Sequence, residues 1–337
     1  MSNPILVEVL RGVVVESRHR GAVAVVDADG GAMLALGDVD RPVFPRSAVK
    51  VLQALPLLET GAADRFALTD AQLALACASH NGEPDHVASA QAVLARAGLD
   101  VTALRCGAHP PIHQPSAAAL YRAGAVPTAL HNNCSGKHAG FLCLACALEA
   151  DPRSYVEPDH PVQRAVKATI ESISGFALAD ERRGVDGCSV PTWAVPLKNL
   201  ALAFARVGSG VGLAPERAKA AARLRAACAA YPWHVAGTGR FCTEVMQLLG
   251  ARAFVKVGAE GVYCGMFPQA GFGFAVKCDD GGARAAEVVT AVLITRFCAL
   301  GEAERAALER FVRPTLRNWN GITVGSLRPT EALVAAH

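Results

Sequence analysis

The sequence predicts an α/β protein of the α+β kind, in which strands from both ends of the chain build one antiparallel sheet. Strand-like patterns fill residues 5–38 and return at 253–277, while the region 47–249 between them is mostly helical by periodicity. Turns of two to five residues separate the strands within each group, which favours antiparallel pairing. We therefore expect a sheet flanked by helices, with a helical lobe inserted into it.

Length and composition place these elements in one globular domain over residues 1–337. Hydrophobic residues make up 52% of the chain and charged residues 19%, a profile typical of a protein with a large core. The net charge is +3 and no basic block occurs, so a nucleic-acid partner is not expected. No run of about 18 apolar residues and no signal-like start are present, which predicts a cytoplasmic protein without a membrane partner. The 11 cysteines, an odd number, are expected to be reduced thiols.

The N-terminal strands are predicted around residues 6–15, 22–27 and 32–36, as a meander with turns at Arg20-Gly21 and 27–31. Periodicity then predicts helices over residues 47–59, 70–78, 85–97, 116–123, 137–149, 161–173, 194–207, 214–229 and 240–249. The C-terminal strands are expected at 253–257, 262–267 and 272–277, followed by a helix at 283–300. The remainder of 283–337 continues as a helix to about residue 311 and then as an irregular tail, which Trp319 anchors over the sheet.

Ser47 and Lys50 form a Ser-x-x-Lys pair at the start of the predicted helix 47–59. Residues three apart share a helix face, so the two side chains are expected to touch. A lysine desolvated by the apolar run that follows is able to accept the proton of a serine nucleophile. The spacing is weak by itself, since a helix-capping serine beside a solvated lysine has the same pattern.

Two further elements strengthen this interpretation. Ser79 lies in Ser79-His80-Asn81, after an apolar helix, and Lys256 lies in Lys256-Val257-Gly258, at the end of a predicted strand. Ser-x-x-Lys, Ser-x-Asn and Lys-x-Gly occur in this order in serine acyl-transfer enzymes of the penicillin-binding and β-lactamase type. The pairs Ser47–Lys50 and Ser79–Lys256 are therefore predicted to be catalytic.

The polar segment 130–140 contains Cys134 and Lys137, and a second polar segment contains Cys188. A phosphate-binding loop is excluded at Gly136-Lys137, because His138 stands where that motif needs Ser or Thr. The two cysteines and the lysine are candidate ligands for a metal such as zinc, although by spacing alone such cysteines are more often inert thiols and lysine is a rare ligand.

Five motifs in order resemble the Rhizobium-type L-asparaginases over nearly the whole chain. They are Pro-Arg-Ser-Ala-Val-Lys at 45–50, Ser-His-Asn-Gly-Glu at 79–83, His-Asn-Asn-Cys-Ser-Gly-Lys-His-Ala-Gly at 131–140, Asp-Gly-Cys-Ser-Val-Pro at 186–191 and Lys-Val-Gly-Ala-Glu-Gly-Val-Tyr at 256–263. The resemblance implies a serine β-lactamase-like fold, a homodimer, and hydrolysis of L-asparagine to L-aspartate and ammonia.

The resemblance also implies roles for individual residues. The paired Ser–Lys dyads carry over to the residues named above, and a Zn²⁺ site carries over to Cys134, Lys137 and Cys188. Because a serine nucleophile is present, we expect the zinc to position the substrate rather than to generate hydroxide. Substrate contacts are expected from Arg46, Asn133, His138 and Asp186. Cys242 matches a cysteine near the family's pocket, where a packing role is equally consistent with its apolar surroundings.

Other functions stay open at this point. Asn and Gln differ by one methylene, so glutaminase activity is an alternative, as is a hydrolase directed at β-lactams on the same scaffold. A third alternative is a non-catalytic protein that binds zinc or an amino acid.

Overall fold

The computed structural model describes residues 2–335 and divides the chain into two compact units. Unit 1 comprises Met1–Ala48, Val195–Gly212 and Arg252–His337, and unit 2 comprises Val49–Ala194 and Leu213–Ala251. The chain therefore passes from unit 1 to unit 2 and back twice. The expectation of one domain over residues 1–337 stays a prediction.

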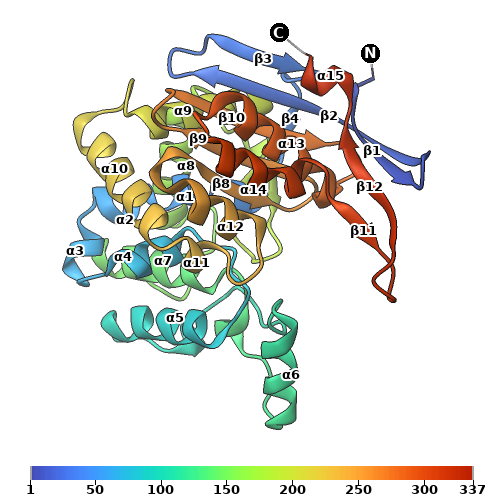
Figure 1. The fold of residues 1–337 in the computed structure, drawn as a ribbon. Coiled ribbons are helices and arrows are strands. Elements are labelled where there is room, and N and C mark those ends of the chain that lie inside the picture. The colour runs from blue at the N-terminus through green and yellow to red at the C-terminus, as the bar shows by residue number, and fades with distance from the viewer. Residues whose placement is uncertain (1, 336–337) are drawn as a thin grey trace. The chain divides into compact units, whose positions relative to one another are not determined.

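Unit 1 contains an eight-stranded sheet in the order β11-β12-β1-β2-β10-β9-β8, with β3 paired to β2 (Figure 1). Every pairing in it is antiparallel. The predicted α+β class, with strands from both ends of the chain in one sheet, is confirmed. The strands are β1 (Ile5–Arg11), β2 (Val14–Asp27), β3 (Ala32–Leu36), β8 (Phe254–Gly258), β9 (Val262–Phe267), β10 (Phe272–Cys278), β11 (Thr315–Arg317) and β12 (Thr323–Pro329).

The long strand β2 corrects the predicted turn at Arg20-Gly21. The turn lies instead at Gly12-Val13, where Gly12 adopts φ 58°, a left-handed conformation that favours glycine. Gly21 lies inside β2, and a Cβ at this position would lie 2.3 Å from the carbonyl oxygen of Lys277. The glycine therefore permits close strand approach rather than a change of direction.

The predicted irregular tail is also wrong, because it contains the strands β11 and β12 and the helix α15. β12 pairs with β1 from Val7↔Pro329 to Arg11↔Gly325. Trp319 lies in the connection between the two strands and is fully exposed, at 106% of its reference area, so it does not anchor the tail.

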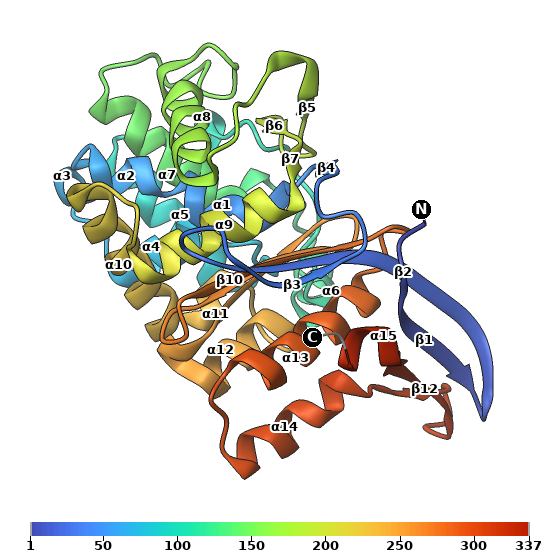
Figure 2. The ribbon, with the colours of Figure 1, turned by 90° about the horizontal axis from the view of Figure 1, so that it is seen from above.

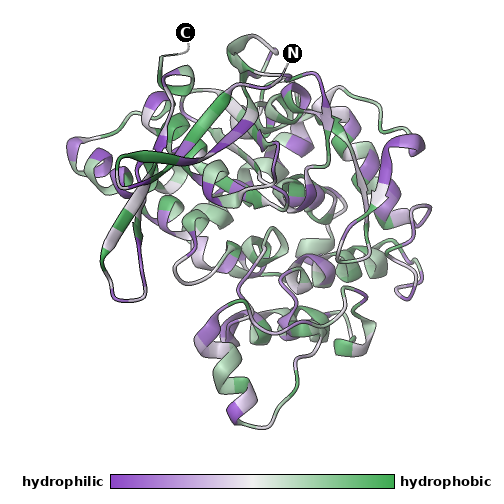
Figure 3. Ribbon diagram, turned by 90° about the vertical axis from the view of Figure 1, so that its right-hand side faces the viewer, coloured by the Kyte–Doolittle hydropathy of each residue, from purple (hydrophilic) through white to green (hydrophobic). Residues whose placement is uncertain are grey.

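Helices cover both faces of the sheet of unit 1. Figure 2 shows α9 (Leu197–Ser209) on one face and α13 (Ala283–Phe297) on the other. Hydrophilic and hydrophobic segments alternate along most helices in Figure 3, as expected for helices with one buried side. The remaining elements of unit 1 are β4 (Pro42–Val43) paired with β7 (Val195–Pro196), η1 (Arg46–Val49), η5 (Gly250–Arg252, which begins in unit 2), α14 (Glu302–Val312) and α15 (Glu331–Val334).

Unit 2 is mainly helical and is built around α7 (Ser135–Ala147), which is buried on all sides from Ser135 to Ala145. A helix that is buried all round is typical of a domain centre. The other elements of unit 2 are α1 (Lys50–Gln53), α2 (Leu55–Glu59), α3 (Ala62–Arg65), α4 (Asp70–Ala76), α5 (Pro84–Arg96), η2 (Val101–Ala103), α6 (Gln114–Arg122), η3 (Ala129–His131), α8 (Pro161–Ser174), η4 (Asp180–Arg182), β5 (Arg183–Val185), β6 (Pro191–Trp193), α10 (Pro215–Ala230), α11 (Pro232–Val235) and α12 (Phe241–Leu249). Among residues 2–335, no helix is both long and apolar enough to cross a bilayer.

Candidate active site

The predicted helix 47–59 is divided into η1, α1 and α2. Pro56 lies in the first turn of α2, and proline has no N–H to continue the hydrogen-bond ladder of a preceding helix. Ser47 is half-buried and lies in the 3₁₀ segment η1, in unit 1. Lys50 is the first residue of α1, in unit 2.

Arg46 precedes Ser47 and has a strained backbone, with φ 51°. A left-handed conformation costs a residue other than glycine on the order of 1–3 kcal/mol. Such strain persists where the surrounding structure holds the backbone in place, often at functional sites. In this chain the strained residue is the first residue of η1.

Within unit 1, η1 packs against the end of β8, the strand that carries Lys256. A Cβ on Gly258 would lie 2.5 Å from the carbonyl oxygen of Pro45 and 3.3 Å from Cβ of Ala48. Lys256 is buried, and its Nζ donates to the carbonyl oxygen of Val257 at 3.0 Å. Glycine at 258 thus lets the turn around Ser47 approach β8 closely.

Gly258→Ala is accordingly expected to displace η1, because the new methyl group would overlap a backbone carbonyl. We expect kcat to fall by about 10²-fold, the usual effect of an ångström-scale misplacement near a reacting group. Steady-state kinetics with folded protein measures this. Gly301→Ala is the control, since the nearest atom to its Cβ is 3.9 Å away. A normal kcat in Gly258→Ala would show that η1 tolerates the shift.

In unit 2, Lys50 is fully buried and its Nζ has three acceptors. They are the carbonyl oxygen of Ala78 at 2.6 Å, Oγ of Ser79 at 3.0 Å and Sγ of Cys134 at 3.0 Å. Nζ of Lys50 thus lies within hydrogen-bond distance of all three groups. Lys50 therefore joins a predicted catalytic serine to a predicted metal ligand.

The backbone around Ser79 is held on both sides. The amide of Ser79 donates to the carbonyl oxygen of Val235 at 3.0 Å, and the amide of His80 donates to that of Asn133 at 3.1 Å. The ring of His80 bonds Oγ of Ser135 through Nε2 at 2.9 Å. Ser79 is thus fixed relative to the N-terminus of α7.

Cys134, Lys137 and Cys188 also meet in unit 2. Nζ of Lys137 donates to Sγ of Cys188 at 3.0 Å, and the two thiols share a hydrogen bond. That bond from Cys188, with the charges of Lys50 and Lys137, lowers the pKa of Cys134 despite burial. The bond to Cys134, together with burial, raises the pKa of Cys188. Of the two thiols, Cys134 is therefore the one that loses its proton more readily.

Local structure explains these positions. Cys134 is the N-cap of α7, and its amide donates to Oδ1 of Asn132 at 2.8 Å. Cys188 lies in the tight connection between β5 and β6, which is closed by a bond from the amide of Ser189 to the carbonyl oxygen of Asp186 at 2.8 Å. Asp186 is thus in the same loop as Cys188.

The donor chemistry of this cluster fits a zinc ion. Two sulfur ligands and one nitrogen ligand suit Zn²⁺, and they leave a fourth position for a substrate. Residues 2–335 contain no cluster of three or more His, Cys, Asp or Glu side chains suited to a metal, so a zinc ion bound by the two cysteines would need Lys137 as a third ligand. Burial favours its neutral form, but Cys188, Cys134 and Asp186 outweigh this and raise the pKa of Lys137. Metal binding would therefore have to displace a proton.

Tyr155 is a contact that the sequence did not reveal. Its hydroxyl lies 2.6 Å from Nδ1 of His138, and both side chains are fully buried. Burial, followed by the charges of Lys137 and Lys50, holds the pKa of His138 well below its usual range, so its ring is neutral. No motif surrounds Tyr155 in the sequence, and only the fold brings it to α7.

His86 supports the Ser79 segment from α5. Its ring stacks between those of His80, at 4.9 Å, and Trp233, at 3.9 Å between centroids. Burial lowers the pKa of His86 from 6.5 to about 4, although its Nε2 contacts the carbonyl oxygen of Trp233.

This shift predicts that acid destabilises the protein. In the unfolded chain His86 binds a proton below about pH 6.5, whereas the folded protein resists protonation down to about pH 4, so stability is lost as the pH falls through this window. Between pH 7 and pH 5 the contribution of His86 is a loss of about 2 kcal/mol in the free energy of unfolding. Urea unfolding of the parent and His86→Gln at both pH values measures it. An equal loss in both proteins would contradict the assignment.

The structure thus connects five predicted residues of unit 2, namely Lys50, Ser79, Cys134, Lys137 and Cys188. Asn133 precedes Cys134, and Arg46, Ser47 and Lys256 lie in unit 1.

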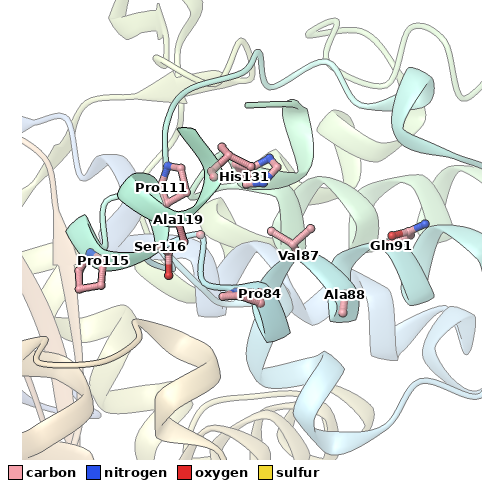
Figure 4. A pocket seen from close by; sticks show the side chains of 11 residues that line it. Pro84, Val87, Ala88, Gln91, Pro111, Pro115, Ser116, Ala119 and His131 are labelled. Atoms are coloured by element: carbon pink, nitrogen blue, oxygen red, sulfur yellow. The ribbon is translucent and has the colours of Figure 1, made fainter. Parts of the chain in front are cut away.

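A separate pocket of about 490 Å³ lies between α5 and α6 in unit 2 and contains none of the predicted residues (Figure 4). Its wall is mainly apolar and includes Val87, Pro111 and Ala119.

Sequence comparison relates the chain to a known family. The sequence profile of the L-asparaginase II family matches residues 7–329, nearly the whole chain. No curated protein is significantly similar to the chain.

Similar solved structures include a β-lactamase from Mycobacterium bovis, at 14% identity and a TM-score of 0.41, covering 83% of this chain and 95% of that one. A protein from Bacteroides dorei described as a candidate β-lactamase has 15% identity and a TM-score of 0.37, covering 78% and 85%. Because these scores are low, the family assignment depends on the profile.

Proposed function

Because the chain belongs to the L-asparaginase II family, we propose that it is an L-asparaginase, which hydrolyses the side-chain amide of L-asparagine to L-aspartate and ammonia. The observation that carries the proposal is the bonding of Lys50 to both Ser79 and Cys134. This arrangement links a proton-transfer group to a cluster able to hold a small polar substrate. Burial of a lysine costs free energy unless polar partners compensate for it, so this placement supports a role in chemistry.

In the proposed mechanism Ser47 is the nucleophile. Its Oγ attacks the side-chain carbonyl carbon as its proton passes to Lys50, which acts as the general base and follows Ser47 by three residues in the continuous segment η1–α1. The C–N bond breaks, ammonia leaves with a proton delivered through Ser79 and Lys256, and a β-aspartyl ester remains on Ser47. Water then hydrolyses this ester. The strained backbone at Arg46 supports a fixed position for the nucleophile.

Substrate recognition is proposed for charged and polar groups around these residues. Arg46 has the charge to bind the α-carboxylate, and Asp186 the charge to bind the α-ammonium group. Asn133 and His138 offer hydrogen bonds to the same ligand. Cys134, Lys137 and Cys188 would hold Zn²⁺, which supplies a positive charge that orients the substrate.

Metal removal is expected to weaken substrate binding more than turnover, because the proposed zinc orients the substrate and does not supply the nucleophile. Chelation should raise KM for L-asparagine by about tenfold or more, the effect typical of a lost charged contact. We expect elemental analysis to find about one zinc per chain in the parent. If the metal-free protein kept its KM and lost only kcat, the positioning role would be wrong.

Cys188→Ser tests the ligand set directly, since a hydroxyl is a poor zinc ligand beside a thiolate. This variant should retain much less zinc than the parent. Cys146→Ser is the matched control, because Cys146 is half-buried at the far end of α7. Equal zinc content in the parent and Cys188→Ser would exclude Cys188 as a ligand.

The function itself is tested by measuring ammonia release from L-asparagine and L-glutamine in parallel, with hydrolysis of a chromogenic β-lactam as a third assay. We expect the highest kcat/KM with L-asparagine. A preference for either other substrate, or no turnover of all three, would replace the proposal with one of the alternatives raised by the sequence.

A further inference from the structure

His138 has one satisfied and one unsatisfied ring nitrogen. It lies in α7, one turn after Cys134, and its amide donates to the carbonyl oxygen of Cys134 at 3.0 Å. Nδ1 bonds the hydroxyl of Tyr155 at 2.6 Å. Nε2 is buried and has no hydrogen-bond partner in the described part of the chain.

The hydrogen bonds around Tyr155 determine where the imidazole proton resides. The amide of Arg105 donates to the Tyr155 hydroxyl oxygen at 2.8 Å, so this oxygen already accepts a bond. The phenolic proton needs an acceptor of its own. Among residues 2–335, Nδ1 of His138 is the atom placed to accept it. Nδ1 is then an acceptor without a proton, and the ring proton is on Nε2.

Tyr155 is well placed to maintain this arrangement. Its side chain is fully buried, and its ring meets that of His138 edge-on, at 5.4 Å and 81°. Its own carbonyl oxygen accepts a bond from Nε2 of Gln163 in α8 at 2.8 Å. The hydroxyl is therefore held by Arg105, and the backbone of Tyr155 is held by α8.

We propose that Tyr155 is a positioning residue that fixes His138 in the Nε2–H tautomer, so that His138 donates a hydrogen bond to an oxygen atom of the bound amino-acid substrate. The part concerning substrate rests on the proposed function. The unpartnered Nε2–H is the donor that such a ligand would satisfy, and a buried donor without a partner is rare in folded proteins. His138 then acts as a donor and not as a general base.

The tautomer is tested by NMR of protein with ¹⁵N-labelled histidine, the His138 signals being assigned by their loss in His138→Gln. We expect an unprotonated Nδ1 and a protonated Nε2 in the parent. In Tyr155→Phe, which removes only the hydroxyl, we expect both tautomers. A proton on Nδ1 in the parent, or an unchanged spectrum in Tyr155→Phe, would overturn the proposal, and the parent spectrum decides even if the variant folds poorly.

Kinetics tests the link to the substrate. Tyr155→Phe should raise KM for L-asparagine by about tenfold, with a smaller change in kcat, as expected for one misdirected hydrogen bond. Tyr263→Phe is the matched control. Tyr263 is also buried, and its hydroxyl donates to Oε1 of Glu287. Its side chain is on the face of β9 opposite that of the next residue, Cys264. Cys264 is the residue of β9 that pairs with Lys256.

The two kinds of failure are distinguishable. An inactive parent with the expected tautomer would refute the proposed function and with it the substrate role, leaving Tyr155 as the group that sets the tautomer. An active parent in which Tyr155→Phe changes neither KM nor kcat would refute the positioning role. Equal changes in KM and kcat in Tyr155→Phe and Tyr263→Phe would show that loss of any buried tyrosine hydroxyl has this effect on the kinetics. That result would also refute the positioning role of Tyr155.

Discussion

Ser47→Ala is expected to lower kcat for L-asparagine by on the order of 10⁴- to 10⁶-fold, as happens when a serine hydrolase loses its nucleophile. Alanine removes a half-buried hydroxyl and leaves the backbone of η1 unchanged, so the melting temperature should change little. The residual rate would come from the groups that bind the substrate.

Mass spectrometry provides the sharper measurement. Rapid acid quenching of the parent during turnover should leave a β-aspartyl group on the peptide that contains Ser47, and this adduct should be missing from Ser47→Ala. Ser89→Ala, at a partly exposed serine of α5, is the control for the substitution itself. An adduct on Ser79, with turnover preserved in Ser47→Ala, would assign the nucleophile to the other serine.

Lys50→Met is expected to have the second largest effect, a fall in kcat of about 10² to 10⁴, the range for loss of a proton-transfer group. Methionine matches the lysine stem but leaves Ser79 and Cys134 without their common donor. Removing one partner of a buried charged pair also destabilises a protein by about 3–5 kcal/mol. Kinetics should therefore be measured well below the midpoint of thermal unfolding.

Lys198→Met is the control for Lys50→Met. Lys198 pairs with Asp40 at 2.5 Å on the surface, where both side chains are more than half exposed. Such a pair contributes about 0–1 kcal/mol, so activity and stability should stay near those of the parent. Comparable kcat values in the two variants would contradict a role for Lys50 in proton transfer.

The sequence predicted the sheet well where its signals were local. β9 was predicted with its observed bounds, because Val262–Phe267 is an apolar run between glycine-containing turns. β12 was missed, since Gly325 and Pro329 lower strand propensity and its partner β1 is more than 300 residues away. Pro329 is tolerated because it is the last residue of the strand, where a missing N–H costs little.

The candidate site was predictable as residue types but not as contacts. Spacing selected Ser47 and Lys50, but the predicted helix 47–59 included Pro56, which separates α1 from α2. The bond from Lys50 to Cys134 joins residues 84 positions apart, and nothing local indicates it. Tyr155 was missed for the same reason. The homodimer and the cytoplasmic location stay predictions.

The pairing of β1 with β12 has a consequence for the order of folding during synthesis. The ribosome makes β1 more than 300 residues before β12, whereas all of unit 2 is complete once residue 251 has emerged. Unit 2 is therefore able to fold while β1 and β2 still lack β8–β10 and β12. During this interval the early strands expose unpaired edges, which are sites of aggregation. We therefore expect a chaperone that binds these strands early to raise the yield of soluble protein. Slow translation or low temperature should raise that yield less.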